Sequence, residues 1–307
     1  MQGNEKFLKR VASYAHKHAL WREGERILAA VSGGPDSLAL LLALKLLAVK
    51  EKINIGCCCV NHHLRAAAGK EAEFVESVCR EWNIPFILKE VDVQSTVRNG
   101  GSIETAARDL RYKALREAAR GGRYAKIAVA HHGDDQAETV LYHLLRGSGV
   151  TGLSGMKPIN GDIIRPFLYV SKNEIKDFLK DFSYVPCHDE SNDVEDAVRN
   201  RIRLSLVPEL ISYNPRVTES LRRTADIFRE EDLFMEEKAD VFISSCVEHD
   251  NDKCVFFIAY FLALHIALQR RVIRKICCMV AGRIPSFEGT ETVSYTHLRA
   301  HETRRHL

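Results

Sequence analysis

The sequence predicts an α/β fold, with a doubly wound parallel sheet followed by a second, smaller all-helical domain. Short apolar runs alternate with helical patterns through the first half of the chain. Continuous apolar strands that alternate with helices favour a parallel sheet covered on both faces. Polar clusters follow three of these runs, at residues 32–37, 61–65 and 131–138. Because ligands of such sheets bind at the carboxyl ends of the strands, we expect one functional site there.

The elements of the expected first domain follow in order. Residues 1–24 form a helix that places Phe7, Val11, Tyr14 and Ala15 on one side. The expected strands are 26–31, 53–60, 85–93 and 125–130. The helices that follow the first two strands span about 38–47 and 69–82. A helix with Ser102 as its N-cap runs to about 119, and a last helix, which begins within the cluster at 131–138, extends to about 145.

The second half begins with a glycine-rich stretch at 146–155, which we expect to be a mobile loop. A helix at 171–182, a polar loop at 187–193 and a basic stretch at 198–203 come next. From Pro215 onward the strand pattern fades and charged, helical segments take over. We therefore expect domains at 1–215 and 216–292. The remaining residues, 293–307, resemble a translated sequencing adapter, with a genuine basic tail as the alternative.

Composition narrows the class of protein. The chain has 307 residues, of which 46% are hydrophobic and 28% charged, and its net charge is +3. These values are ordinary for a soluble globular protein, and any nucleic-acid binding must come from local basic patches. No apolar run reaches the roughly 18 residues that a membrane span needs, and the N-terminus lacks the apolar core of a signal peptide. We expect a cytoplasmic protein that does not bind membranes.

The first polar cluster reads as a phosphate-binding loop between a strand and a helix. Glycines let the backbone approach a ligand closely, and the first amides of a helix point outward without internal partners. Together they form an anion site. A carboxylate in the loop repels phosphate unless Mg²⁺ lies between them. The alternative is an ordinary turn with a Ser/Asp N-cap. The loop residues are Ser32, Gly33, Gly34, Pro35, Asp36 and Ser37.

The last polar cluster is acidic. His131, Asp134, Asp135 and Glu138 lie at a strand end and in the first turn of a helix, and Asp135 and Glu138 share a face. Acidic residues in a first turn also serve the helix dipole, which is the structural alternative. Facing the Asp36 loop, they would complete a metal or base site.

Two groups of basic residues accompany these clusters. Arg108 and Arg111 lie on one helix face and would hold a phosphate or nucleotide bidentately, unless they form surface salt bridges. Arg199, Asn200, Arg201 and Arg203 form either an exposed face or a contact to tRNA. The nine cysteines contain no Cys-x-x-Cys spacing, so we expect reduced core residues and no metal framework.

Taken together, these motifs resemble the tRNA(Ile)-lysidine synthases, which belong to the N-type ATP pyrophosphatases of the PP-loop superfamily. The resemblance covers about residues 20–290. It rests on Ser32–Ser37, Val60–Arg65, Glu104–Tyr112, His131–Thr139, Arg146–Met156, Arg165–Phe167, Asp189–Asn192 and Arg199–Arg203.

The resemblance implies a fold of the adenine nucleotide alpha hydrolase type and an ATP-dependent ligase. Such enzymes adenylate the C2 oxygen of cytidine 34 in the CAU anticodon of tRNA(Ile), and L-lysine then displaces AMP. Members usually carry a further C-terminal tRNA-binding region, which we expect to be missing here. ATP, Mg²⁺, L-lysine and tRNA(Ile) are the implied ligands, and a homodimer is kept as an alternative to a monomer.

By resemblance, Asp36, Asp135, Glu138 and Arg111 are the catalytic candidates, with Asp36 also the magnesium ligand. Adenosine and phosphate contacts would come from loop 32–37, His62, Arg65 and His131. Arg108, Arg199, Asn200, Arg201 and Arg203 would contact tRNA.

Three rival functions remain. A 2-thiolation enzyme of the same superfamily would need cysteine pairs or an Fe–S cluster; Cys79 and Cys187 are the proposable pair. An amide-forming ligase such as an NAD synthetase would leave the basic stretch 198–203 unexplained. A non-catalytic nucleotide-binding module would gain little from acids near phosphate.

Overall fold

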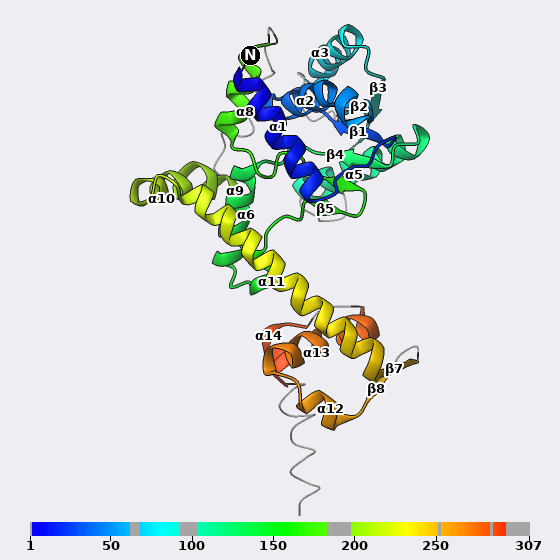
Figure 1. The fold of residues 1–307 in the computed structure, drawn as a ribbon, viewed down its shortest axis with the longest axis vertical. Coiled ribbons are helices and arrows are strands. Elements are labelled where there is room, and N and C mark those ends of the chain that lie inside the picture. Colours follow the sequence, from blue (N-terminus) through cyan, green and yellow to red (C-terminus); the bar gives the residue numbers. More distant parts are fainter. Residues whose placement is uncertain are drawn as a thin grey trace, which may run out of the picture. The chain divides into compact units, whose positions relative to one another are not determined.

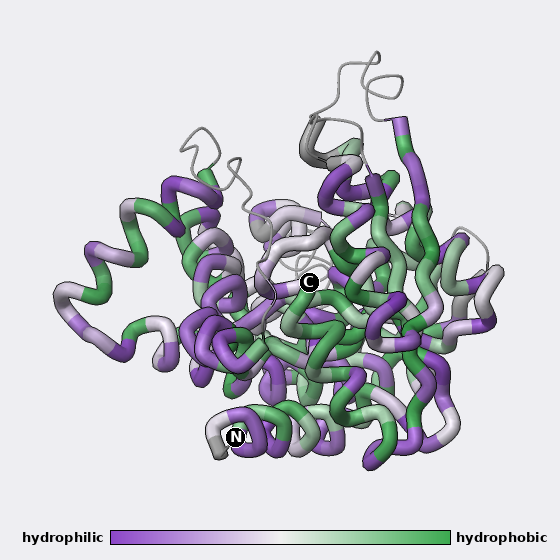
Figure 2. Tube along the Cα trace, turned by 90° about the horizontal axis from the view of Figure 1, so that it is seen from above, coloured by the Kyte–Doolittle hydropathy of each residue, from purple (hydrophilic) through white to green (hydrophobic). Residues whose placement is uncertain are grey.

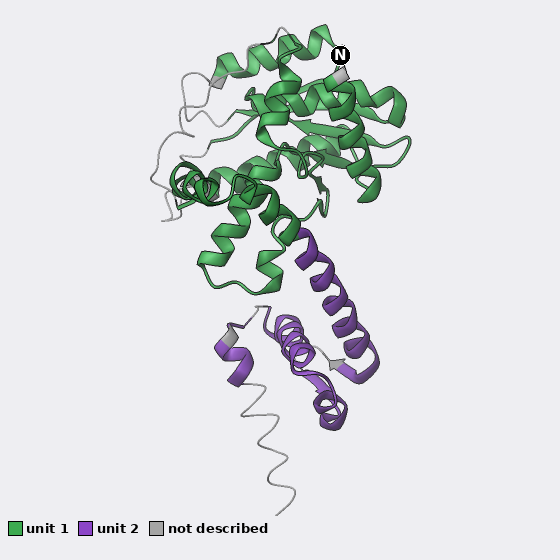
Figure 3. Ribbon diagram, turned by 60° about the vertical axis from the view of Figure 1, so that its left-hand side comes forward, with its two compact units in different colours: residues 1–225 green, residues 226–307 purple. Residues whose placement is uncertain are grey.

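A computed structural model describes residues 2–61, 68–92, 103–182, 184, 198–250, 253–282 and 285–292 of the chain (Figure 1). The tail 293–307, for which we expect an adapter origin, lies outside the described residues. Contacts divide the chain into two compact units, Met1–Ala225 and Asp226–Leu307 (Figure 3). The division falls inside helix α11, Val217–Cys246, whereas the sequence analysis expects a boundary at 215/216.

The first unit is built on the four expected parallel strands. Strand β1, Arg26–Ala30, lies between β2, Asn54–Asn61, and β4, Lys126–Ala128, and β3, Phe86–Glu90, extends the sheet beyond β2. The full order is β3-β2-β1-β4-β6-β5. The predicted fold class is therefore confirmed. The order reverses direction next to β1, which places the carboxyl ends of β1 and β4 side by side.

Two very short strands at one edge of the sheet are missed by the sequence analysis. Strand β6, Ile163–Ile164, pairs parallel with β4, and β5, Ile159–Asn160, pairs antiparallel with β6. Gly161 makes the turn between them with φ +61°. Two residues are too few to show the alternation by which a strand is recognised.

Helices cover both faces of this sheet, as expected. In β1, Ile27 and Ala29 pack into one core and Leu28 into another, because successive strand side chains point to opposite faces. The first core contains buried residues from α1 (Gln2–Lys17), α2 (Pro35–Glu51), α3 (Ala68–Glu81) and α8 (Lys172–Leu179). The second core contains buried residues from α5 (Ile103–Gly121).

Helix α2 is buried along its apolar stretch, where Leu38 to Leu44 are 0% exposed. Helix α1, beside the label N in Figure 2, contains both hydrophobic and hydrophilic residues. The four side chains that were expected to share a face are buried. The expected helix at 1–24 is too long, however. It ends at Lys17, and Ala19 and Gly24 then adopt positive φ values of 49° and 84°.

The segments after β4 complete the first unit. Helix α6, Gly133–Leu145, ends at the expected position. The expected loop at 146–155 contains a short helix, α7, Val150–Leu153, which corrects that expectation. The basic stretch forms α9, Val198–Arg201, and continues into the π-helix η2, Ile202–Leu206, and α10, Val207–Tyr213.

The second unit is not all-helical, so that part of the predicted fold is wrong. Strands β7, Val247–Asp250, and β8, Lys253–Phe256, pair as an antiparallel hairpin. Its other elements are the second part of α11, α12 (Ile258–Leu262), α13 (Ile266–Ala281) and α14 (Phe287–Thr292). Phe242, Phe261 and Val272 belong to its core. Among the described residues of the whole chain, no helix has the length and apolar character that crossing a membrane requires.

Candidate active site

The loop after β1 has the shape of an anion site. Gly33 has φ +87°, a left-handed conformation that favours glycine. The Ser37 hydroxyl donates to the Gly34 carbonyl at 3.0 Å and accepts from the Ser32 amide at 3.2 Å, which closes the loop. Gly34 is the N-cap of α2 and has no side chain to cap it, and Pro35 is the next residue. The first amides of α2 therefore lack a side-chain cap and are available to a ligand.

Asp36 presents an unpaired oxygen beside this loop. Its Oδ1 is buried and has no hydrogen-bond partner among the described residues. No group of three or more His, Cys, Asp or Glu side chains within the described ranges is arranged to hold a metal ion. A magnesium ion that takes one carboxylate from the protein and its other ligands from phosphate and water fits this arrangement.

His132 joins the loop to the acidic cluster. Its Nε2 lies 3.6 Å from Asp36 Oδ2 and 3.6 Å from Asp135 Oδ2. Its Nδ1 lies 3.7 Å from Asp134 Oδ2. The structure thus brings Asp36 and Asp135 to one imidazole, although three strands separate them in sequence. His132 also caps α6, since it accepts from the Asp135 amide while Asp135 accepts from the His132 amide.

The three carboxylates determine the charge of this histidine. Burial lowers the pKa of His132, but the hydrogen bond to Asp36 and the charges of Asp135, Asp36 and Asp134 raise it, and the net shift is upward. The shift moves the protonation of His132 to higher pH. A protonated His132 would offset the charges of the carboxylates around it, whereas the neutral ring accepts from the Asp135 amide at Nδ1.

Asp135 stays ionised for the matching reason. Burial raises its pKa, whereas the charges of His132 and His131, the His132 amide and the charge of Arg199 lower it, and the net shift is downward. A carboxylate with a lowered pKa is a weak proton acceptor but a good partner for a cation.

His131 differs from its neighbour. Its pKa is lowered to about 3. Burial is the largest cause, the charge of Asp135 opposes it, and the charges of Arg165, Arg108 and Arg111 add to the lowering. Its Nδ1 is buried without a hydrogen-bond partner among the described residues. His131 is therefore a neutral imidazole at pH 7.

Glu138 is held by arginines from the basic stretch. It is 3% exposed, and Arg203 donates to its two oxygens at 2.8 and 3.0 Å. Arg203 Nη2 also lies 3.5 Å from Asp135 Oδ1. Arg199 Nε lies 3.6 Å from Glu138 Oε2, and its Nη2 donates to the Thr139 hydroxyl at 3.2 Å. The structure therefore brings Arg199 and Arg203 to the acidic cluster.

The other predicted site residues lie elsewhere. Arg108 and Arg111 have their guanidinium carbons 5.4 and 5.5 Å from the centre of the Tyr112 ring, and both act electrostatically on His131. Arg201 is exposed and Asn200 half-buried. The structure records no ion pair between Arg201 and another described residue. His62, Arg65 and the stretch 189–192 lie outside the described residues.

Two features of the site escaped the sequence analysis. The sequence analysis includes His132 in the motif His131–Thr139 but assigns it no role, although its place directly before Gly133 and two acids is that of an N-cap. Gly133 is required by packing, because a Cβ there would lie 2.4 Å from Arg222 Nη1 and 2.9 Å from the Val170 carbonyl oxygen. Asp134, by contrast, has a structural role, since its Oδ2 accepts the Lys172 amide at 2.7 Å.

Curated relatives match most of the chain. It is 35% identical over 284 residues to a tRNA(Ile)-lysidine synthase from Caldanaerobacter subterraneus subsp. tengcongensis, covering 92% of this chain and 61% of that relative. A tRNA(Ile)-lysidine synthase from Thermotoga sp. strain RQ2 is 35% identical over 267 residues, covering 87% of this chain and 64% of that one. The chain thus spans less than two thirds of the length of these relatives.

A solved structure and a family model agree on the fold. The U34-tRNA thiolase NcsA from Methanococcus maripaludis, solved with its 4Fe-4S cluster, superposes with a TM-score of 0.59 at 18% identity, covering 74% of this chain and 80% of that one. At this identity the likeness concerns the fold alone. The model of the PP-loop domain matches residues 4–210. The loop at 32–37 and the sheet that carries it lie within this match, and the chain belongs to the PP-loop domain family.

Proposed function

We propose that this protein is an ATP-dependent ligase that adenylates the C2 oxygen of cytidine 34 in the CAU anticodon of tRNA(Ile) and attaches L-lysine to give lysidine. The observation that carries the proposal is the meeting of Asp36 and Asp135 at His132, each 3.6 Å from its Nε2. An anion site and a carboxylate site are thereby adjacent. The relatives named tRNA(Ile)-lysidine synthase support the same reaction.

The first step would take place at the loop. The C2 oxygen of cytidine attacks the α-phosphorus of ATP, and pyrophosphate leaves. The amides at the start of α2 would hold the departing pyrophosphate, because they point outward and have no side-chain cap. Asp36 Oδ1 would hold Mg²⁺, which supplies positive charge to the phosphate oxygens.

The second step would take place beside α6. The lysine ε-ammonium would first lose a proton to solvent. The neutral amine then attacks C2, the C2–oxygen bond breaks, AMP leaves, and the new nitrogen gives a proton to solvent. Arg203 contacts both Asp135 and Glu138, and the pKa of Asp135 is lowered, so this site suits the binding of a cationic amine better than the removal of its proton. We propose that Asp135 and Glu138 anchor lysine. Arg203, which contacts both carboxylates, would place its positive charge between lysine and the adenylate.

The thiolation alternative receives less support from the cysteines. Cys57, Cys58, Cys59 and Cys79 are buried, and burial raises the pKa values of Cys58 and Cys59 to about 12. The thiols of Cys58 and Cys59 are therefore poor nucleophiles, because the reactive form is the thiolate. Cys187, the other proposable cysteine, lies outside the described residues.

The test is to incubate the protein with ATP, labelled lysine and a CAU isoleucine tRNA transcript and to measure label in the tRNA. We expect label that depends on ATP and on the C at position 34, with one AMP released per lysine. A transcript with U at position 34 is the control. Labelling of both transcripts alike, or of neither, contradicts the proposal. A cytoplasmic location and a homodimer stay predictions, and sedimentation at several concentrations tests the dimer.

A further inference from the structure

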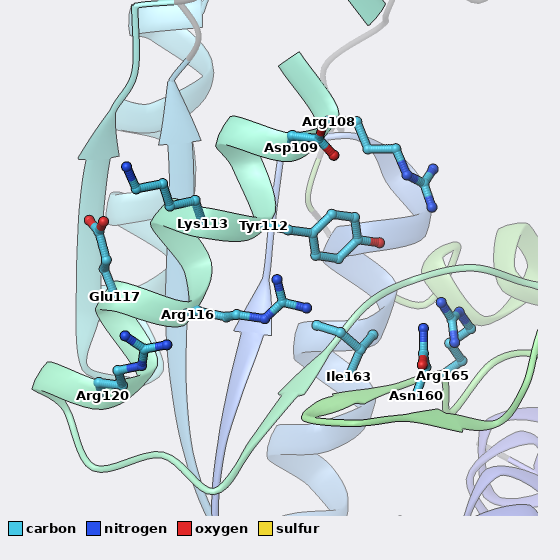
Figure 4. Close-up of a pocket in the computed structure, with 10 residues that line it drawn as sticks. All are labelled: Arg108, Asp109, Tyr112, Lys113, Arg116, Glu117, Arg120, Asn160, Ile163 and Arg165. Atoms are coloured by element: carbon cyan, nitrogen blue, oxygen red, sulfur yellow. The ribbon is translucent and has the colours of Figure 1, made fainter. Parts of the chain in front are cut away.

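A groove of about 660 Å³ lies between helix α5 and the β5–β6 hairpin, outside the site described above. Figure 4 shows Arg108, Tyr112 and Arg116 extending from α5 toward Ile163 and Arg165. We call it the α5 groove. All of its lining residues belong to the first unit and to the described part of the chain.

The α5 groove is cationic. Its five basic lining residues are Arg108, Lys113, Arg116, Arg120 and Arg165, against the two acids Asp109 and Glu117. Arg116 pairs with Asp162 at 3.1 Å, and both side chains are more than a third exposed. A pair so exposed to solvent contributes little to stability and can exchange partners. The positive charge of the groove is therefore largely available to an anionic ligand.

The arrangement of the cations indicates an extended ligand. Arg108, Arg116 and Arg120 lie at intervals of eight and four residues along α5, and all three line the groove. From Arg108 to Arg120 the helix rises by roughly 18 Å. A single phosphate cannot contact both ends of such a row, whereas a chain of phosphates can.

Arg165 provides a second, independent indication of a ligand. It is 6% exposed, and its Nη1 donates to the Lys157 carbonyl at 2.7 Å. Its Nε is buried and has no hydrogen-bond partner among the described residues. The structure records no ion pair between Arg165 and another described residue, and Arg165 lines the groove, so an anion bound there would offset the charge of a largely buried guanidinium.

The surroundings of Tyr112 favour phosphate over a nucleobase. Guanidinium carbons of Arg108, Arg111 and Arg116 lie 5.4, 5.5 and 5.9 Å from the centre of its ring. The three arginines already surround the ring, so it is a poor surface on which to stack a base. The same arginines form a cluster of donors suited to phosphate oxygens.

One end of the α5 groove adjoins the candidate active site. Strand β6, which carries Ile163, pairs with β4, whose carboxyl end leads to His131. Arg108 and Arg165 also act electrostatically on His131. A polyanion that lies in the groove would therefore pass close to the reacting groups.

We propose that the α5 groove binds the phosphodiester backbone of the tRNA substrate next to its anticodon and so sets the position of the RNA in the site. This inference rests on the proposed function. It adds Lys113, Arg116, Arg120 and Arg165 to the candidate RNA contacts, none of which the sequence analysis selected. Phosphate contacts of this kind fix position and register without reading sequence.

The test compares two double variants that remove the same charge. Arg116→Gln/Arg120→Gln changes the α5 groove at the end away from His131, and Lys6→Gln/Lys176→Gln changes exposed lysines on α1 and α8. Binding of the CAU isoleucine tRNA transcript is measured by fluorescence anisotropy from 50 to 300 mM NaCl. We expect the groove variant to bind roughly tenfold more weakly at low salt and to lose about 1.4 from the slope of log K against log salt.

The outcomes separate this inference from the proposed function. The control double variant should bind tRNA like the unmodified protein, and both variants should bind ATP unchanged. If the groove variant keeps the affinity and the salt slope of the control, the α5 groove does not bind RNA, whether or not lysine is transferred. If the groove variant loses RNA binding but the unmodified protein transfers no lysine, the groove assignment stands and the proposed reaction fails. Equal loss with both double variants would indicate a general charge effect and overturn the inference.

Discussion

The loop at residues 32–37 and the carboxylates of α6 meet at the same histidine, yet they are built differently. The loop is shaped by backbone: a positive φ at Gly33, hydrogen bonds around Ser37, and a helix start with no side-chain cap. The acidic end is filled with side-chain ion pairs, in which Glu138 is 3% exposed and joined to Arg203 at 2.8 Å.

This difference follows from what each end must bind. Backbone amides carry only partial charges, so they need no counterion when no phosphate is bound. Buried carboxylates cannot, because an unpaired charge away from water is costly. Arginine and histidine side chains therefore neutralise the acidic end before a substrate arrives, and a cationic substrate has to share or replace those partners.

We expect the largest effect from Asp36→Asn, which removes the negative charge of the loop at residues 32–37. The amide keeps the shape of the side chain but cannot bind Mg²⁺ as a carboxylate does. We expect tRNA-dependent ATP–pyrophosphate exchange to fall at least about a hundredfold, with an unchanged circular dichroism spectrum. Exchange within twofold of the unmodified protein would remove Asp36 from the site.

Glu138→Gln tests whether the ion pairs at the acidic end serve lysine. The substitution leaves Arg203 without its bidentate acceptor, so we expect about 2 kcal/mol less unfolding free energy. We also expect a KM for lysine raised at least about tenfold. Urea unfolding and lysine-transfer kinetics measure the two effects, with Glu209→Gln, on the short helix α10, as the control. An unchanged KM for lysine would contradict the assignment.

The contrast between the two ends also explains what the sequence could predict. The loop and the four parallel strands β1 to β4 are recognisable because each depends on neighbouring residues, such as the apolar run before Ser32. The partners of the acidic end are distant: Arg203 is 65 positions from Glu138, and no local pattern links them. The resemblance places Arg111 with the carboxylates as a catalytic candidate, whereas the recorded contacts of Arg111 are to Tyr112 and, through its charge, to His131.

The errors in the fold have a similar cause. Strands β5 and β6 contain two residues each, and β7–β8 is a short hairpin in a region rich in helical patterns. Such strands are fixed by pairing with a neighbour, and alternation over two to four residues carries little information. His62 and Arg65, for which a role at adenosine was expected, lie outside the described residues, and their role stays a prediction.

The unfolding free energy as a function of pH distinguishes the two adjacent histidines, His131 and His132. Since the pKa of His131 is lowered to about 3, the unfolded chain binds more protons than the folded one between pH 6.5 and 3. The unfolding free energy should therefore fall as the pH falls through this window, by about 1 to 2 kcal/mol between pH 6.5 and 5.

His131→Asn should flatten this part of the stability profile, as measured by urea unfolding at half-unit steps. The pKa of His132 is raised, so its contribution has the opposite sign: it is present below pH 6.5 and is lost as the pH rises through the folded pKa. A profile for His131→Asn that parallels the unmodified protein from pH 6.5 to 5 would mean that His131 is not held neutral.

The smallest effect concerns the backbone of the loop. Gly33→Ala places a side chain at φ +87°, which should cost about 1 kcal/mol of unfolding free energy. Gly24→Ala is a matched control, because Gly24 has φ +84° and an added Cβ would meet nothing within 4 Å. Both variants should lose similar stability, and only Gly33→Ala should weaken ATP binding in equilibrium dialysis. Equal ATP binding by the two variants would show that the loop does not hold the nucleotide.

The most direct test of a site with two separable ends is tRNA-dependent ATP–pyrophosphate exchange by Glu138→Gln in the absence of lysine. If the loop performs adenylation while the carboxylates bind lysine, exchange should stay within about threefold of the unmodified protein, although the KM for lysine in the transfer reaction is raised. Exchange that falls to the level of Asp36→Asn would show that the two ends do not act in separate steps, and would contradict this account.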